Sequence, residues 1–241
     1  MAELEFKYIY HSHTERCGHA SGKDEEIVLA AIKSGVKVLC MTDHCPIPNH
    51  EQEGIRMKND QLNEYVKTWT DLKNKYKDQI EIHIGLEAEY SIEHHDYLKD
   101  YVLNRGIEFY ICGEHLYELN NELIWIGRSK INDRVRSREE IANEYVKQVL
   151  DGMNRGYIKY LAHPDNFIVK QGCFDKLVKD SARKIIETAI KNDVILELNV
   201  HGGYNHNFEE FGYPCVHFWK LIKNEYPEAK GVLASFGVII K

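Results

Sequence analysis

Paired cysteines and long apolar runs are both missing from this sequence of 241 residues. Its six cysteines are scattered and no two form a Cys-x-x-Cys pair, and a chain of this length does not need disulfides to fold. No stretch of 18 apolar residues occurs, and the N-terminus lacks the apolar segment of a signal peptide. We therefore expect a cytoplasmic protein that does not span a membrane.

An excess of positive charge is also lacking. The formal net charge of -7 disfavours a general nucleic-acid-binding protein, because such proteins gain affinity from Lys and Arg at the phosphates. The hydrophobic content of 43% and the charged content of 29% are typical of a folded globular chain. No linker-like or low-complexity tract divides the sequence, so we predict a single domain over residues 1–241.

Short apolar runs alternate with longer segments of helical period, a pattern that predicts βα units and a parallel sheet. The seven expected strands lie at 6–10, 36–41, 80–86, 107–112, 157–162, 194–200 and 231–235. The expected helices lie at 24–34, 60–77, 93–104, 138–154, 175–192 and 215–225. Ser137 and Glu140 fit a capping box at the start of the fourth helix. Two stretches, 45–59 and 116–137, are long for loops and are candidates for binding segments.

Histidines and carboxylates follow six of these runs. Barrel enzymes carry their chemistry at the C-terminal ends of parallel strands, so we expect these side chains to meet at one rim. Imidazole and carboxylate are ligands of zinc, manganese and iron, and His-x-His on an extended segment turns both rings to one side. The residues are His11, His13, His19, Asp43, His44, Glu87, Glu89, His115, His163, Asp165, Asn199 and His201.

This set is larger than a single zinc ion needs, because zinc takes three or four protein ligands. We therefore predict two or three divalent metals. Such clusters hold the attacking and leaving oxygens in phosphoryl displacement and lower the pKa of a coordinated water. Hydrolysis of a phosphate ester is the expected chemistry.

The motifs, in this order, resemble the PHP (polymerase and histidinol phosphatase) family, and within it the histidinol-phosphatase type. "HSHTERCGHA" at 11–20, "MTDH" at 41–44 and "GLEAEY" at 85–90 look like its first, second and Gly-x-Glu motifs. "GMNRGYIKYLAHPDNF" at 152–167 and the segment from "ELNVHGG" at 197–203 onward are similar to later parts of the phosphatase branch. The likeness covers nearly the whole chain.

The resemblance implies an α/β fold, a distorted seven-stranded (β/α)7 TIM-like barrel, that holds up to three metals, commonly zinc, manganese or iron. One metal is expected on His11, His13 and Glu87. Glu87 is then expected to bridge to a second metal. The remaining expected ligands are His115 and His163 for the second metal, and His19 and His44 for the third.

The same resemblance suggests roles beyond metal binding. Glu87, His44 and Asp43 are the expected catalytic residues. Two interpretations of Asp43, Asp165 and Asn199 stay open, because each could orient an imidazole or cap a helix.

The sequence departs from the family pattern near its end. Family members finish the seventh strand with an Asp-x-His pair that binds metal, whereas Phe236 and Val238 stand at those places here. This predicts a truncated or degenerate C-terminal end; a natural change, a frameshift and a truncation are open explanations. His201 is interpreted as a partial substitute, a phosphate contact or a surface residue.

Phosphate recognition requires cationic donors near the metals. The loop "IGRSKINDRVRSR" at 126–138 offers Arg128 and Ser129 as expected phosphate contacts, and His201 is a third expected contact. Arg16 and Arg56 are the alternatives. The expected activity is that of a metal-dependent phosphatase acting on a small phosphate ester, with L-histidinol phosphate of histidine biosynthesis as the substrate. Another PHP phosphoesterase, such as a protein-tyrosine phosphatase, and a catalytically impaired metal-binding relative are the alternatives.

Overall fold

The protein is represented by a computed structural model. The residues it describes are 7–47, 54–119, 122–125, 137–201 and 210–234. The chain divides into two compact units. The first consists of Met1–Ala88, Ile92–Ile111 and Ser235–Lys241, and the second of Glu89–Ser91 and Cys112–Ala234. Each unit is described by itself, and the single domain expected over residues 1–241 stays a prediction.

All seven apolar runs that were expected to be strands contain one. The strands are β1 (Tyr8–Ile9), β2 (Val38–Met41), β3 (Glu81–Ala88), β4 (Phe109–Cys112), β7 (Tyr160–Leu161), β8 (Ile195–Asn199) and β9 (Gly231–Ala234). Their order in the sheet follows their order in the chain, and the pairings β1–β2, β2–β3, β4–β7, β7–β8 and β8–β9 are all parallel. The predicted α/β class is therefore confirmed.

Helices occupy the segments between these strands. The five that match an expected segment closely are α1 (Asp24–Lys33), α2 (Leu62–Tyr76), α4 (Arg138–Asn154), α6 (Lys176–Lys191) and α8 (Val216–Glu225). The segment expected at 93–104 changes its winding twice. It begins as α3 (Ile92–Tyr97), continues as a π-helix over Leu98–Val102, and ends as a 3₁₀ turn over Leu103–Arg105 before Gly106, whose φ is 98°.

Two features were not predicted. The strands β5 (Leu116–Leu119) and β6 (Glu122–Trp125) pair antiparallel in a stretch expected to be a loop. The short helix α5 (Ile168–Gln171) follows β7. Both are too short to produce a clear period in the sequence.

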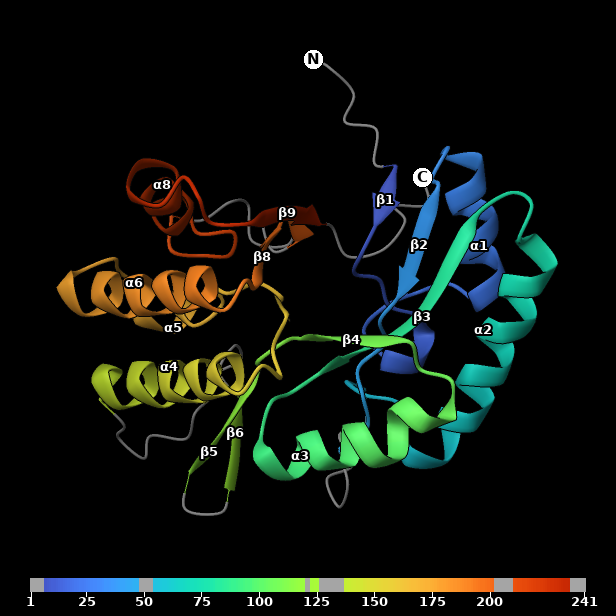
Figure 1. Cartoon of the computed structure of the whole chain (residues 1–241), viewed down its shortest axis with the longest axis horizontal. Coiled ribbons are helices and arrows are strands. Elements are labelled where there is room, and N and C mark those ends of the chain that lie inside the picture. Colours follow the sequence, from blue (N-terminus) through green and yellow to red (C-terminus); the bar gives the residue numbers. More distant parts are fainter. Residues whose placement is uncertain (1–6, 48–53, 120–121, 126–136, 202–209, 235–241) are drawn as a thin grey trace. The chain divides into compact units, whose positions relative to one another are not determined.

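The core of the first unit lies between its strands and two helices. α1 and α2 cover one face of β2 and β3 (Figure 1), and Trp69 of α2 is fully buried there. The Tyr65 hydroxyl of the same helix donates to the Gly85 carbonyl of β3 over 2.8 Å. A Cβ at Gly85 would lie 2.5 Å from the ring of Phe109, so any larger residue at this position would displace that ring.

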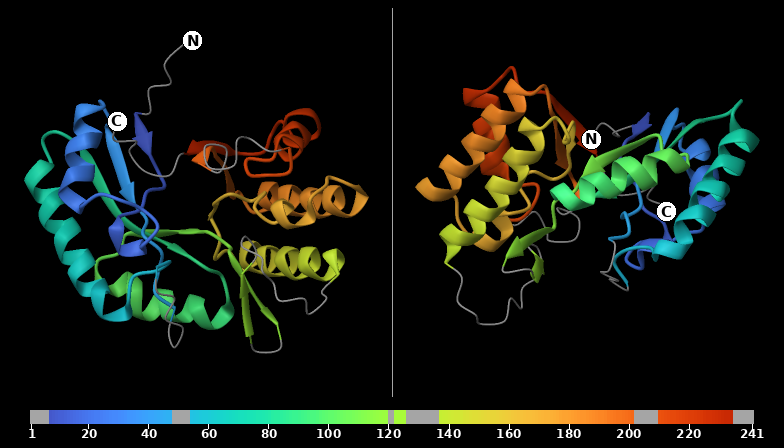
Figure 2. Two further views of the ribbon diagram at one scale, coloured as in Figure 1. Left: turned by 180° about the vertical axis from the view of Figure 1, so that it is seen from behind. Right: turned by 60° about the horizontal axis from the view of Figure 1, so that its bottom comes forward.

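The core of the second unit lies among its helices. α4 packs against α6, and α6 packs against α8 (Figure 2). The rings of Tyr145 and Phe167 stack with centroids 5.1 Å apart, and Phe218 of α8 is also fully buried. This core supports β7 and β8, whose ends carry the polar residues of the second unit described below.

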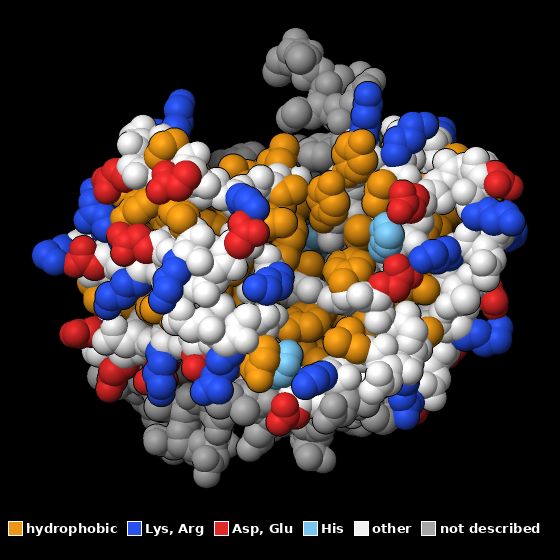
Figure 3. All heavy atoms as spheres, viewed as in Figure 1, with side chains coloured by type: hydrophobic (Ala, Val, Ile, Leu, Met, Phe, Trp, Pro, Cys, Tyr) orange, Lys and Arg blue, Asp and Glu red, His pale blue; other side chains and the backbone are white. Residues whose placement is uncertain are grey.

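The exterior carries charges of both signs. On the face shown in Figure 3, Lys and Arg side chains alternate with Asp and Glu over the helices. Among the described residues, no helix combines the length and the apolar composition that a membrane crossing requires.

The N-terminus of α4 provides a test of local stability. The Glu140 amide donates to Ser137 Oγ over 3.1 Å, and the Ser137 amide donates to Glu140 Oε2 over 2.8 Å, so the predicted capping box is confirmed. Ser137→Ala should lower the free energy of unfolding by about 1 kcal/mol, measured by urea denaturation. Ser137→Asp keeps an acceptor oxygen and should retain most of the stability. Equal losses in the two variants would show that the cap does not stabilise the helix.

Candidate metal centre

A single buried carboxylate organises the polar residues of the first unit. The Glu87 Oε2 atom lies 3.2 Å from a ring nitrogen of each of three histidines, His11, His13 and His44. The Nε2 atoms of His11 and His13 are 3.0 Å apart. All four side chains belong to residues that are at most 3% exposed. Several ligand-type atoms are therefore concentrated in one buried place.

Parallel strand ends bring these residues together. His11 and His13 follow β1 and are two residues apart, so an extended backbone turns both rings to the same side. His44 follows β2 and is joined by an isolated parallel bridge to Glu87 of β3. The Glu87 amide donates to the Asp43 carbonyl over 3.1 Å, which fixes the register of the two segments.

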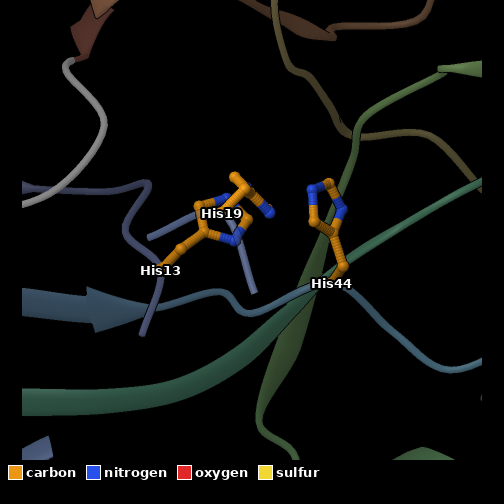
Figure 4. Close-up of side chains that lie close together, drawn as sticks. All are labelled: His13, His19 and His44. Atoms are coloured by element: carbon orange, nitrogen blue, oxygen red, sulfur yellow. The ribbon is translucent and has the colours of Figure 1, made fainter. Parts of the chain in front are cut away.

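His19 adds a fourth imidazole ring to this cluster from a short turn. Its ring centroid lies 5.2 Å from that of His13 and 5.1 Å from that of His44 (Figure 4). The turn passes through Gly18, whose φ is 69° and where a Cβ would lie 2.5 Å from the Cα of Gly54. Glycine at position 18 is thus needed both for the backbone angle and for the close approach.

Burial determines the protonation of His13. It lowers the pKa of His13 to about 3, although Glu87 acts in the opposite direction. His13 is therefore neutral at pH 7, the state in which imidazole binds a metal. Burial also raises the pKa of the Asp43 carboxyl and of the Cys17 thiol, while hydrogen bonds from Thr14 and Cys17 partly oppose the shift at Asp43.

The donor atoms fit a divalent transition metal. One ligand atom from each of His13, His19 and His44 lies within 4.8 Å of the others, and the same holds for His11, His13 and Glu87. Ligands that each lie about 2.0–2.2 Å from one ion are separated by no more than about 4.4 Å, so only small shifts are needed for coordination. Imidazole and carboxylate are the ligand types that zinc, manganese and iron accept.

A second pair of histidines belongs to the second unit. The rings of His115 and His163 have centroids 4.7 Å apart. Glu89 holds His115 with both carboxylate oxygens: Oε1 lies 3.0 Å from His115 Nδ1, and Oε2 accepts from the His115 amide over 2.7 Å. A carboxylate only accepts, so Nδ1 carries the proton, and in the neutral ring Nε2 then carries the lone pair that a metal needs.

His163 has an unusual backbone that a neighbouring carboxylate supports. Its φ of 33° lies in the left-handed region, which is strained for a residue other than glycine. The His163 amide donates to Glu197 Oε2 over 3.0 Å. Glu197 is fully buried and also accepts from the Tyr160 hydroxyl over 3.0 Å and from Asn199 Nδ2 over 3.2 Å. The three donors compensate for burying this charge and fix the His163 backbone.

Asp43, Asp165 and Asn199 were expected either to orient an imidazole or to cap a helix, and their contacts bear on this choice. Asp43 Oδ1 lies 3.9 Å from His13 Nδ1. Asp165 accepts from the amide of Cys215, the N-cap residue of α8, over 2.6 Å and from Trp219 Nε1 over 2.9 Å. Burial raises the pKa of Asp165 to about 7. Asn199 Oδ1 accepts from the His201 amide over 2.9 Å. The described contacts of Asp165 therefore go to the start of α8.

Two contributors were not recognised from the sequence pattern. Cys17 is one of several scattered cysteines, and Glu197 was not singled out, whereas Glu89 was among the expected strand-end residues without a predicted partner. Glu197 did carry a signal, because it is the only charged residue in the apolar strand run 194–200. Glu89 contacts His115 over 26 positions, and Cys17 contacts Asp43 and His44 over 26 and 27 positions, so these contacts had no local signal.

The expected phosphate contacts are only partly covered by the structure. Arg128 and Ser129 lie outside the described residues, as do Phe236 and Val238. Of the alternatives, Arg16 is held by Asp24 and by Glu64, whose Oε1 lies 2.9 Å from Arg16 Nη2. Two further candidates are described: buried Arg56, which donates to the Cys45 carbonyl over 3.3 Å, and half-buried His201.

Comparison with known proteins identifies a family match. The PHP domain model matches residues 10–201. A Deinococcus radiodurans protein named probable histidinol-phosphatase is 38% identical over 80 residues, which is 33% of this chain and 31% of that protein. The matches to the first three curated relatives cover between 31% and 50% of their lengths.

Solved structures show the same fold. A Listeria monocytogenes protein assigned as a histidinol phosphatase superimposes with a TM-score of 0.76 at 22% identity, over 95% of both chains. A histidinol phosphate phosphatase from Lactococcus lactis, solved with zinc, L-histidinol and phosphate, gives 0.70 at 20% identity, over 96% of this chain and 86% of that one. These likenesses confirm the expected (β/α)7 barrel-type fold.

The two glutamates of the "GLEAEY" segment provide a test of the candidate metal centre. Glu87→Gln removes the charge among three imidazoles and should weaken zinc binding by more than about 100-fold. Glu89→Gln alters the hydrogen bonds from His115 and from the Leu116 amide and should cost about 10-fold. Competition with a chromophoric chelator measures both affinities. Equal effects, or the reverse order, would mean that Glu87 is not the central ligand.

Proposed function

This chain belongs to the PHP domain family, and from that premise we propose that it is a metal-dependent phosphatase that hydrolyses L-histidinol phosphate to L-histidinol and phosphate. The observation that carries the proposal is the position of the Glu87 carboxylate, 3.2 Å from ring nitrogens of three buried histidines. The relatives named histidinol-phosphatase support the choice of substrate.

We assign the metal ligands by the donor sets of the two units. His11, His13 and Glu87 form one set, and His19 and His44 provide ligands for another. His115 and His163 provide ligands in the second unit, and the expectation that Glu87 also binds their metal stays a prediction. Two or three ions are thus proposed, with zinc, manganese and iron as candidates. When bound, such ions neutralise phosphate charge and lower the pKa of a coordinated water.

The side chains around the proposed ligands would keep the imidazoles correctly oriented for coordination. Neutral imidazoles can coordinate without first releasing a proton, and the pKa of His13, lowered to about 3, keeps that ring neutral throughout the physiological range. Glu89 and Glu197 hold His115 and the His163 backbone in fixed orientations. Asp43 accepts from the Thr14 amide, the Thr14 hydroxyl and the Cys17 thiol, so we assign it a positioning role.

Substrate recognition would rest on cationic and hydroxyl donors. We retain Arg128, Ser129 and His201 as the proposed phosphate contacts, because a guanidinium matches two phosphate oxygens at once. Arg16 is the weaker alternative, since Asp24 and Glu64 already engage its guanidinium.

Turnover of defined substrates tests the proposed function. The purified protein is treated with a chelator, then reloaded with zinc, manganese or iron, and phosphate release is measured from L-histidinol phosphate, a generic aryl phosphate and a phosphotyrosine peptide. L-Histidinol phosphate should give the highest kcat/KM, and the activity should vanish on chelation and return on reloading. A metal-loaded protein without activity would instead be a catalytically impaired relative, and a preference for the peptide would indicate a tyrosine phosphatase.

Arg128→Ala tests the proposed phosphate contact. Loss of a charge-assisted hydrogen bond should raise KM for L-histidinol phosphate about tenfold or more while the metal content stays unchanged. Arg134→Ala, six positions further along the sequence, is the matched control and should leave KM as it is. If both variants behave like the unmodified protein, phosphate is bound elsewhere, and Arg56 becomes the next residue to substitute.

A further inference from the structure

The thiol of Cys17 lies beside the metal-binding cluster of the first unit. It ends a 3₁₀ turn over Glu15–Cys17 and is fully buried. Its Sγ atom lies 3.0 Å from Asp43 Oδ1, 3.1 Å from the His44 amide nitrogen and 3.4 Å from His13 Nδ1. One sulfur atom therefore contacts two segments that carry expected metal ligands, those of His13 and His44.

The number of hydrogens on each group determines the donor and the acceptor in these contacts. A thiol has one hydrogen to donate, and the Asp43 carboxylate can only accept. The Thr14 amide and hydroxyl also donate to Asp43, over 2.6 and 2.7 Å, which is the pattern around an ionised carboxylate. The S–H hydrogen is thus directed to Asp43, and the His44 amide donates to the sulfur. The sulfur then has only an acceptor role toward His13.

This assignment favours one tautomer of His13 in the metal-bound state, in which an ion rather than a proton lies between His13 Nε2 and Glu87. If the sulfur accepts from His13, the proton lies on Nδ1 and the lone pair on Nε2. Nε2 is the atom that lies 3.2 Å from Glu87 Oε2 and 3.0 Å from His11 Nε2. The lone pair therefore points to the place where the other ligand atoms meet.

We propose that Cys17 is a positioning residue that holds His13 as the Nδ1–H tautomer and anchors the His44 backbone, so that both rings are prepared for metal binding. The role resembles that of a carboxylate that orients a ligating histidine, here carried by a neutral thiol linked to Asp43. The inference rests on metal binding by His13, as in the proposed function, and not on the identity of the substrate.

Two other roles for a buried cysteine predict different results. A thiol that only fills space would not influence the tautomer or the metal affinity beyond its effect on stability. A thiolate that binds the metal itself would produce a sulfur-to-metal charge-transfer band. Cys40 of β2 is a matched control, because it is 6% exposed and also a buried thiol, while its strand pairing places it opposite His83.

The test combines spectroscopy of the unmodified protein with zinc affinities of variants. Nitrogen NMR of the zinc-loaded, ¹⁵N-histidine-labelled protein should show His13 protonated at Nδ1 and coordinated through Nε2, and the cobalt-substituted protein should lack a thiolate charge-transfer band. Cys17→Ala should weaken zinc binding by about 10-fold or more, Cys17→Ser should regain most of it, and Cys40→Ala should bind zinc as the unmodified protein does.

Three results would overturn the inference. They are coordination of His13 through Nδ1, a thiolate band in the cobalt form, and equal zinc affinities for Cys17→Ala and Cys40→Ala. The spectra need no variant, so they decide the question even if Cys17→Ala does not fold. A protein that passes this test but releases no phosphate from any ester would refute the proposed function and leave the role of Cys17 intact.

Discussion

The buried Glu87 carboxylate is the constraint on which the first unit depends. Removing a charge from water costs several kcal/mol unless other groups compensate for it. Here three imidazoles surround one carboxylate oxygen at 3.2 Å, and burial keeps at least His13 neutral. A cation at this place would satisfy the carboxylate and the ring nitrogens together. The cluster is therefore best explained as a metal site.

Backbone pairing, a thiol and two carboxylates hold the histidines of both units in place. In the first unit, the parallel bridge between His44 and Glu87 fixes two ligand segments in register, and the Cys17 thiol contacts His13 on the opposite ring nitrogen. In the second unit, Glu89 and Glu197 serve the same purpose for His115 and His163. Both units thus use buried hydrogen bonds to orient imidazoles, as is typical of histidines that bind a metal.

Much of this arrangement could be predicted from the sequence, because strand period and strand ends are local signals. His-x-His after one apolar run, and Gly-x-Glu within another, are sufficient to place these side chains at the ends of parallel strands. The hydrogen bonds that orient the ligands have no such signal. Glu197 contacts a residue 34 positions earlier, and Cys17 contacts His44 over 27 positions, so their roles depend on how the strands pair.

Short and irregular elements were also not predicted from the sequence. The hairpin of β5 and β6 and the helix α5 have only four residues in each element, too few for a period to show. The change from α- to π- and 3₁₀-winding over 92–105 likewise leaves the apolar spacing of a helix almost unaltered. Their positions depend on tertiary packing rather than on local propensity.

Anomalous diffraction from zinc-soaked crystals tests the central claim most directly, because it locates the metal without reference to activity. Data collected on both sides of the zinc absorption edge should give a peak within coordination distance of His13 Nε2 and Glu87 Oε2, with His11 as a further ligand. A fully loaded crystal whose zinc peaks all lie away from Glu87 would contradict the account, since the carboxylate among three imidazoles would then have a purpose other than binding a metal.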